Sequence, residues 1–276
     1  MGRHGVRVIN GYFHKEFTKS KYYHRELGAL RKMRNHPFVT DVIESFQHDV
    51  IDGKFYGKIT MIYCRGCDLH SWIIDKPDGS SLLFCKYYFK KLLIAYHYAK
   101  SRHIWHRDIK PENIMIDLNG VIKLIDWELS TNRRYNYQRV GTEQYMSEET
   151  HLAQFHDCEQ SDVWSMGVTL FAVAIGQRPY GNIFSEIING VKVYDEWLEM
   201  IFYKQWERFW RLMEEKHNSK ALKNRQFRKI IQCMLQKDPS KRIKIEDLME
   251  HDFFLDDNLC RSELMQQVEL VSHTFK

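Results

Sequence analysis

One segment, residues 105–129, constrains the fold of this chain more than any other, and it reads WHRDIKPENIMIDLNGVIKLIDWEL. Short apolar runs at residues 114–116 and 121–125 flank a Leu-Asn-Gly turn, a pattern that predicts a small β-hairpin. Charged and amide residues directly precede the hairpin, and Asp126 follows its second strand. We therefore expect a short hairpin with polar side chains at both of its ends.

The part of the chain up to residue 63 predicts a small β-sheet with one helix. Asn10-Gly11, the strongest two-residue signal for a type I′ hairpin turn, lies between two β-rich segments. Residues 20–34 carry apolar side chains at helical spacing. The segments expected to form strands are 5–9, 12–17, 39–46 and 58–63.

Beyond residue 63 the patterns are mostly helical, beginning with a long amphipathic stretch at residues 82–100. The sequence contains no internal repeat, low-complexity tract or Pro/Gly/Ser-rich linker. We therefore expect an α+β fold of two lobes within the 276 residues, rather than two independent domains. The expected parts are a small sheet lobe at 1–63, a larger helical lobe at 64–258 and a C-terminal tail at 259–276.

Composition and charge exclude several classes of protein. Hydrophobic residues make up 43% and charged residues 28%, with only 14 Gly and 5 Pro, which excludes collagen and wholesale disorder. A net charge of +5 is too small to indicate nucleic-acid binding. The six cysteines form no disulfide-scaffold pattern, and we find neither a signal-peptide run nor about 18 consecutive apolar residues. We expect an intracellular protein, cytoplasmic and/or nuclear, that binds neither nucleic acid nor membranes.

The stretch at residues 106–113 resembles the catalytic loop of the eukaryotic-type protein kinases, which reads HRDxKxxN. Asp126, thirteen residues after Asn113, stands where the DFG motif of that family begins. The resemblance runs from about residue 12 to residue 254 and implies an ATP-binding cleft between the two lobes. Further matches follow in the family order at residues 140–149, 161–167, 177–180, 234–242 and 251–254.

The resemblance implies ATP- and Mg²⁺-dependent phosphorylation of Ser/Thr in protein substrates, with Mn²⁺ as an alternative ion. It makes Asp108 the carboxylate that receives the substrate hydroxyl and Lys110 the cation near the transferring phosphate. It makes Asn113 and Asp126 the ligands of the metal. A lysine two residues after Asp108 is typical of serine/threonine kinases, whereas tyrosine kinases usually carry Ala or Arg after the catalytic Asp.

In the small lobe the resemblance depends on order and spacing. Lys15 stands where the family has the lysine that contacts the α- and β-phosphates, and Glu26, eleven residues later, where a helical glutamate pairs with it. A lysine on a strand facing a helical glutamate is also a common surface pair of little energetic value. The remaining positions that the resemblance assigns to ATP are the gatekeeper Met61, the hinge residues Tyr63 and Cys64, and Asp68 near the ribose.

Three departures qualify the resemblance, of which the replacement of Ala-Pro by Ser147-Glu148 should matter mainly for local packing. Only Gly2 and Gly5 precede the first expected strand, where the family has a loop with three glycines close to the phosphates. The DFG triplet reads Asp126-Trp127-Glu128, in which tryptophan can fill the apolar slot as it does in casein kinase II. Glu128 replaces a glycine, and its carboxylate would either approach Mg²⁺ or point to solvent.

These departures leave other functions open. One alternative is a pseudokinase, a scaffold or regulatory binding module with weak or no catalysis. Another is a small-molecule phosphotransferase of the aminoglycoside-kinase type, although the segments at 140–149 and 161–167 resemble those of kinases that act on peptides. The hairpin segments resemble casein kinase II locally and Gly141-Thr142 does not, so the subfamily stays open.

Two weaker signals concern partners. Basic side chains on the helix at 20–34, with Arg133, Arg134 and Arg139, either select acidic substrates or form a solvated face. The aromatic-rich segment 195–217 predicts a helix that either packs within its lobe or offers a docking or homodimer surface.

In the large lobe, the resemblance pairs Glu149 with Arg242 as a structural contact.

Overall fold

The computed structural model describes residues 5–51, 54–188 and 191–254. Asn10 and Gly11 have φ angles of 51° and 79°, and positive φ at both central positions is what a type I′ turn requires. The turn joins β1 (Val6–Ile9) to β2 (Tyr12–Phe17) in an antiparallel pair. The first predicted hairpin is therefore confirmed.

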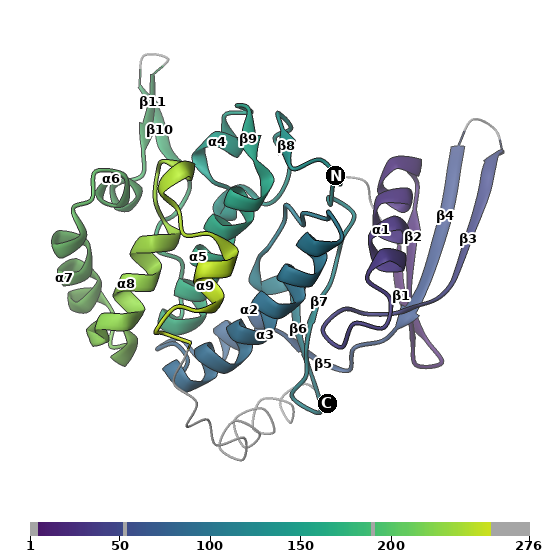
Figure 1. Ribbon diagram of the computed structural model, residues 1–276, viewed down its shortest axis with the longest axis horizontal. Coiled ribbons are helices and arrows are strands. Elements are labelled where there is room, and N and C mark those ends of the chain that lie inside the picture. The colour runs from purple at the N-terminus through teal and green to yellow at the C-terminus, as the bar shows by residue number, and fades with distance from the viewer. Residues whose placement is uncertain (1–4, 52–53, 189–190, 255–276) are drawn as a thin grey trace.

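Both strands belong to a four-stranded antiparallel sheet in the order β1-β2-β4-β3 (Figure 1). The sheet is completed by β3 (Val42–Ile51) and β4 (Lys54–Ile62). Helix α1 (Ser20–Lys32) packs on the sheet and buries Tyr23 and Leu27, as its apolar spacing predicts. The small lobe thus has the predicted sheet and single helix.

A three-stranded antiparallel sheet lies where the two lobes meet. Its order is β5-β6-β7, formed by β5 (Gly66–Asp68), β6 (Ile114–Asp117) and β7 (Ile122–Leu124). The predicted second hairpin is confirmed, because Ile116 pairs with Ile122 across its turn. Leu124 also forms an isolated parallel bridge with Val39, which connects this sheet to the small lobe.

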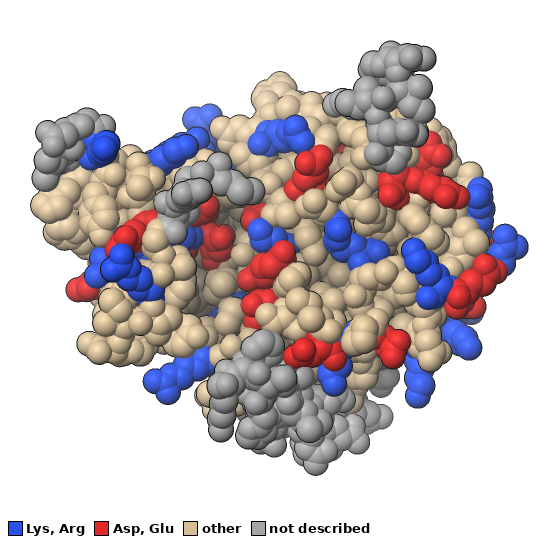
Figure 2. Space-filling model, turned by 180° about the vertical axis from the view of Figure 1, so that it is seen from behind, with Lys and Arg blue, Asp and Glu red and all other residues tan. Residues whose placement is uncertain are grey.

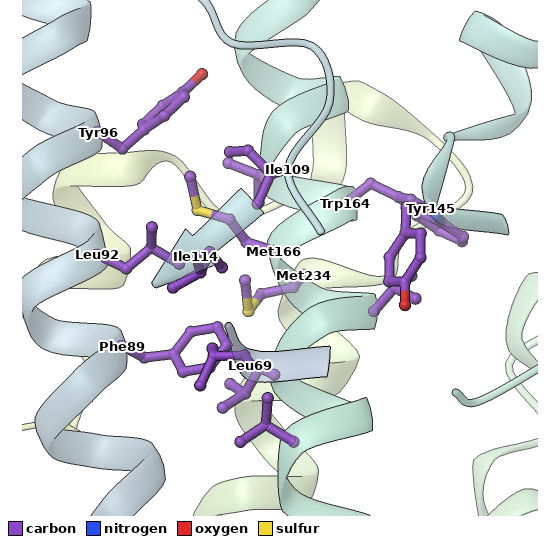
Figure 3. Close-up of a cluster of buried hydrophobic side chains, with 14 of the residues drawn as sticks. Leu69, Phe89, Leu92, Tyr96, Ile109, Ile114, Tyr145, Trp164, Met166 and Met234 are labelled. Carbon is purple, nitrogen blue, oxygen red and sulfur yellow. The ribbon is translucent and has the colours of Figure 1, made fainter. Parts of the chain in front are cut away.

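The large lobe is built around α5 (Cys158–Ile175), all of whose residues are buried. A helix that is buried on all sides must be surrounded by other elements, and α3 (Leu82–Ser101) packs along it. Figure 3 shows Leu92, Met166 and Met234 among the apolar side chains that converge in this core. Further helices are α2 (Leu69–Ile74), α4 (Glu148–His151), α6 (Glu196–Phe202), α7 (Trp206–Lys216), α8 (Arg225–Met234) and α9 (Ile245–Met249).

A small sheet lobe beside a larger helical lobe confirms the predicted α+β fold (Figure 1). β4 ends at Ile62, close to the predicted division at residue 63, and the predicted tail at 259–276 lies outside the described residues. Two short antiparallel pairs complete the described strands: β8 (Tyr135–Asn136) with β9 (His156–Asp157), and β10 (Phe184–Ile188) with β11 (Val191–Tyr194). Among the helices described, none combines the length and the apolar character that crossing a bilayer requires.

The prediction of one helix over residues 195–217 is wrong, because the structure has α6 and α7 there. The helical conformation is interrupted at Lys204, whose φ of 57° lies in the left-handed region. Met200 and Phe209 would lie on opposite faces of one continuous helix, yet both are buried here. The break thus lets both helices bury apolar side chains, and Trp210 packs inside as well, which supports the packing interpretation. The docking or homodimer surface stays a prediction.

The predicted pair of Glu149 and Arg242 is confirmed. The guanidinium donates from Nη2 to Glu149 Oε2 at 2.9 Å, and both residues are buried. This contact joins α4 to the segment that precedes α9, at the side of the central helix α5.

Candidate active site

Asp108 lies at the centre of a set of hydrogen-bond donors. Its Oδ1 accepts from the backbone N–H and from Oγ1 of Thr142, both at 2.7 Å. Its Oδ2 lies 3.2 Å from Asn113 Nδ2 and 3.1 Å from Lys110 Nζ. The structure thus brings together the three predicted catalytic residues, and donors to both oxygens hold the Asp108 carboxylate in one orientation.

A buried carboxylate on the central helix shapes this loop. Asp162 accepts the backbone N–H groups of His106 and Arg107 at 2.9 and 2.8 Å, and the hydroxyl of Tyr96 at 2.9 Å. These bonds hold Arg107 in the left-handed region, with φ of 67°. Burial raises the pKa of Asp162 to about 7, although its three hydrogen bonds act in the opposite direction. Asp162 therefore supports the loop from the central helix.

The hairpin brings Asn113 and Asp126 side by side, because the N–H of Ile125 donates to the carbonyl of Asn113 at 3.0 Å. Asp126 has a φ of 64°, and the residue after it turns into the core. Trp127 is fully buried and packs edge-on against the ring of His106, with 4.5 Å between centroids. The expectation that Trp127 fills an apolar slot is therefore confirmed.

Lys15 lies inside a cluster of three carboxylates. Its Nζ is 3.2 Å from Glu26, 2.6 Å from Asp126 and 3.1 Å from Glu128. Lys15 and Glu26 are both buried, so the alternative of an ordinary surface pair is wrong for them. We call these four residues the Lys15 cluster.

One cation among three acidic groups shifts the pKa of several cluster members. Burial lowers the pKa of Lys15, but the surrounding carboxylates more than compensate, and the pKa lies above its ordinary value. Burial also raises the pKa of Glu26, which the charge of Lys15 only partly offsets. For Asp126 the influence of Lys15 outweighs that of burial, and its pKa is lowered. Negative charge therefore exceeds positive charge at this position.

Glu128 points toward Lys15, so the alternative of a solvent-directed side chain is wrong. Carboxylate oxygens of Glu26, Asp126 and Glu128 all lie within 4.8 Å of one another. Because Trp127 between them is anchored in the core, Asp126 and Glu128 project together to the side where Lys15 lies. The sequence left this open, since nothing in it shows which way Glu128 points.

A cavity of about 190 Å³ opens next to the Lys15 cluster, between the lobes. Its lining includes the predicted residues Lys15, Glu26, Asn113 and Asp126, together with Met61, Tyr63 and Cys64. Figure 2 shows the hollow between the small lobe, at the left of that view, and the large lobe, with acidic and basic side chains along it. Most of the surface within the cavity is apolar, which suits a planar ring held at one end by charged groups.

Asp68 is the predicted contact that the structure does not bring into this cavity. It is the N-cap of α2 and accepts the backbone N–H of Ser71 at 2.8 Å and the hydroxyl of Ser71 at 3.2 Å. It is not among the residues that line the cavity.

The donor set fits a nucleotide with a divalent cation. Asn113 and Asp126 offer the amide and carboxylate oxygens that Mg²⁺ prefers, and the side chain of Asp126 is one-third exposed toward the cavity. Lys15 lines the same cavity and supplies a positive charge. These residues could therefore hold the phosphates and the metal, with the apolar walls around a base.

Sequence reasoning missed the roles of three neighbouring residues. Thr142 contacts both Asp108 and Lys110, with 2.7 Å between its Oγ1 and Lys110 Nζ. Gln138 accepts a hydrogen bond from Arg107 Nη1 at 3.0 Å. Asp162 holds the loop, as described above. Thr142 and Asp162 fall in segments where the resemblance gave a signal, whereas no sequence pattern distinguishes Gln138.

Comparison with known proteins agrees with this geometry. The family described as "Protein kinase domain" matches residues 6–254. CBL-interacting serine/threonine-protein kinase 20 of Arabidopsis thaliana is 28% identical over 243 residues, which cover 83% of this chain and 47% of the relative. CBL-interacting protein kinase 5 of Oryza sativa subsp. japonica is 27% identical over 244 residues, 83% of this chain and 45% of the relative.

A third relative, the cGMP-dependent protein kinase of Plasmodium berghei (strain Anka), is 30% identical over 172 residues, 59% of this chain and 19% of the relative. The chain thus spans less than half the length of these curated relatives. The family match nevertheless covers most of the chain, including both lobes and the cavity between them. The chain belongs to the protein kinase domain family.

Proposed function

We propose that this protein transfers the γ-phosphoryl group of ATP, in the presence of Mg²⁺, to serine or threonine hydroxyls of protein substrates. The observation that carries the proposal is that Asp108, Lys110 and Asn113 lie together in contact. Asn113 also lines, with Lys15 and Asp126, one cavity between the lobes. Relatives whose names identify them as serine/threonine-protein kinases support the choice of acceptor.

In this proposal the apolar end of the cavity receives the adenine, with Met61 behind it and the backbone of Tyr63 and Cys64 beside it. Lys15, positioned by Glu26, contacts the phosphates. Asp68 is left out of the proposed contacts because its carboxylate caps α2 outside the cavity.

Asn113 and Asp126 would hold Mg²⁺, with Mn²⁺ as the alternative ion. The bound metal would supply positive charge to the phosphate oxygens during transfer. This chain contributes the oxygen ligands and fixes them: the Asn113 amide donates to the Asp108 carbonyl at 2.8 Å, which leaves its oxygen for the metal.

Asp108 would orient the attacking hydroxyl and receive its proton. The hydroxyl oxygen forms a bond to the γ-phosphorus while the bond from that phosphorus to the ADP oxygen breaks, and the proton passes to Asp108. Lys110 lies 3.1 Å from Asp108 and would balance charge on the transferred group. The hydroxyl of Thr142, which donates to Asp108, is the group that the substrate would replace.

The protein substrate would lie in a groove beside Asp108. The groove is lined by Glu112, Thr142, Tyr145, Arg178 and Lys216, among others, and it carries both signs of charge. Of the two alternatives left open by the sequence, acidic substrates or a solvated basic face, the proposal takes the first, with Arg178 and Lys216 of this groove as the basic contacts. Arg134 and Arg139 face acidic residues of this chain instead, since they lie 2.8 Å from Asp157 and 3.5 Å from Glu143.

The test is transfer of labelled phosphate from Mg-ATP to a generic protein substrate. Wild-type protein should transfer label, and Asp108→Asn should abolish transfer without changing the fold. Asp247→Asn, a matched change at an exposed position on α9, should leave transfer unchanged. Equal transfer by the wild type and Asp108→Asn would contradict the proposal.

The same preparation separates the alternatives. A pseudokinase scaffold would show no transfer above the Asp108→Asn background, even if ATP stabilises it. A small-molecule phosphotransferase would phosphorylate small alcohols in preference to peptides. The proposal expects peptides to be the better substrates, because the groove beside Asp108 is open along α2 and the segment after α5.

A further inference from the structure

Three carboxylates surround the ammonium group of Lys15. Lys15 Nζ donates hydrogen bonds to Glu26 at 3.2 Å and to Asp126 at 2.6 Å, and the carboxylate of Glu128 forms an ion pair with it at 3.1 Å. The cavity beside it, at about 190 Å³, is smaller than the roughly 300–1,000 Å³ of typical ligand sites. A nucleotide phosphate that enters beside Lys15 would therefore compete with these carboxylates for its positive charge.

The three carboxylates differ in how easily they can leave. The Glu26 side chain is 1% exposed, so moving it away from Lys15 would leave its charge buried among apolar groups. The Glu128 side chain is 18% exposed and can turn to water when its contact with Lys15 is lost. Asp126 is 34% exposed, but it is a ligand of the metal in the proposed function and must stay at the site.

We propose that Glu128 is a positioning residue that competes with the nucleotide phosphates for Lys15. In the nucleotide-free protein its carboxylate takes the place that a phosphate oxygen would occupy, and it holds Lys15 ready beside Glu26 and Asp126. When ATP binds, Glu128 releases Lys15 to the phosphates and turns outward. The inference rests on the proposed function, because it assumes that ATP occupies this cavity.

The first consequence concerns affinity. Glu128→Gln keeps the shape of the side chain and removes the charge, so the phosphates meet a weaker competitor. We expect ATP to bind more tightly by about 5-fold, the scale of one partly exposed ion pair. Adenosine, which has no phosphate, should bind equally to both proteins, and ATP in EDTA should show the same gain as Mg-ATP.

The experiment is calorimetric titration of wild type, Glu128→Gln and Glu128→Gly with adenosine, ATP in EDTA and Mg-ATP. Glu250→Gln, which removes an exposed carboxylate just after α9, controls for the change in net charge. Phosphorylation kinetics add a second readout: KM for ATP should fall about 5-fold in Glu128→Gln, with kcat within about 2-fold of wild type. Glu128→Gly tests the same loss of competition with a different side chain, should one variant fold poorly.

Two results would overturn the inference while leaving the proposed function intact. One is equal ATP affinity in wild type and both variants, together with active wild-type enzyme. The other is weaker binding of Mg-ATP by Glu128→Gln, with ATP in EDTA unchanged, which would make Glu128 a ligand of the metal. If wild type binds no ATP and transfers no label, the proposed function fails, and the inference about Glu128 fails with it.

Discussion

Two ionic clusters, one inside the large lobe and one between the lobes, differ in charge balance. In the large lobe, Arg242 faces a single carboxylate, that of Glu149, at 2.9 Å. Its other N–H groups donate to backbone carbonyls, those of Gln160 at 3.1 Å and Gln236 at 2.7 Å among them. One cation thus meets one anion, and neutral oxygens take the remaining donors.

The Lys15 cluster, which joins residues of both lobes, has the opposite character. One cation faces three acidic side chains there, and the cluster borders a cavity rather than a closed core. An ion pair with balanced charges and satisfied donors gains no stability from a further ligand. A cluster with surplus negative charge, by contrast, is stabilised by a cation that binds from solution. The comparison shows why the first cluster stabilises the fold and why the second is suited to bind a ligand with its metal.

The largest effect should come from breaking the balanced pair. Arg242→Ala leaves the buried carboxylate of Glu149 without its cation, and we expect a loss of about 3–5 kcal/mol in the free energy of unfolding. Urea denaturation measures this loss. Arg211→Ala, at an exposed position on α7, should change the same free energy by less than about 0.5 kcal/mol. Similar free energies of unfolding for the two variants would show that Arg242 has no structural role.

The support of the catalytic loop should rank second. Asp162→Ala removes the acceptor of two backbone N–H groups and of the Tyr96 hydroxyl, which leaves buried donors without a partner. We expect the free energy of unfolding to fall by about 2–3 kcal/mol, and label transfer to fall at temperatures where the variant is still folded. A variant with normal transfer would show that Asp108 is held by other contacts.

Acid should weaken the balanced pair. Burial raises the pKa of Glu149, but the charge and hydrogen bonds of Arg242 lower it by more. The pKa of Glu149 therefore lies below its ordinary value of about 4.5. The pair therefore contributes stability that is present above about pH 4.5 and is lost as the pH falls through the lowered pKa. Unfolding measured from about pH 6 to pH 3 should show this loss in wild type and a flatter profile in Arg242→Ala.

Removing a carboxylate should have opposite consequences in the two clusters. Glu149→Gln takes away the partner of Arg242 and should destabilise the protein, by about 2 kcal/mol. Glu128→Gln relieves repulsion around Lys15, and we expect the nucleotide-free protein to be unchanged or more stable by up to about 1 kcal/mol. Parallel urea titrations compare the two variants. A large destabilisation by Glu128→Gln would show that the Lys15 cluster is also a structural contact.

The smallest effect should be at Gln138. Burial lowers the pKa of Arg107 to about 10, and Arg107 nevertheless donates to the neutral side chain of Gln138. Gln138→Ala removes this acceptor, and we expect label transfer to fall about 2- to 5-fold. Gln138→Glu supplies a stronger acceptor and should retain or raise transfer. If both variants transfer label equally, the contact between Arg107 and Gln138 does not position the segment that contains Gln138.

The parts of this structure that the sequence predicted are those set by local chemistry. Asn10-Gly11 specifies its turn because both residues tolerate positive φ. The order of Asp108, Asn113 and Asp126 fixed the expected site, since a short hairpin brings the last two together whatever the surroundings. These features depend on residues that are close in sequence.

The features that the sequence did not predict depend on packing between distant elements. Apolar residues before and after Lys204 have the spacing of a single helix. Met200 and Phe209 would lie on opposite faces of that helix, and because both are buried the helix must be interrupted between them. The direction of Glu128 follows from the burial of Trp127 beside His106, a contact over 21 positions that no local pattern reveals. Asp68 was expected at the cavity from its position alone, and its capping bond to Ser71 places it elsewhere.

The central claim is that the Lys15 cluster is a ligand site completed by Mg-ATP. A thermal melt with and without millimolar Mg-ATP tests it most directly. We expect a rise in Tm of several degrees for wild type, because a ligand at about 100 times its Kd adds roughly 2.7 kcal/mol. We expect no rise in Tm for Lys15→Met and an undiminished rise for Arg211→Ala. A Tm of wild type that Mg-ATP leaves unchanged, or an equal rise in Lys15→Met, would contradict it.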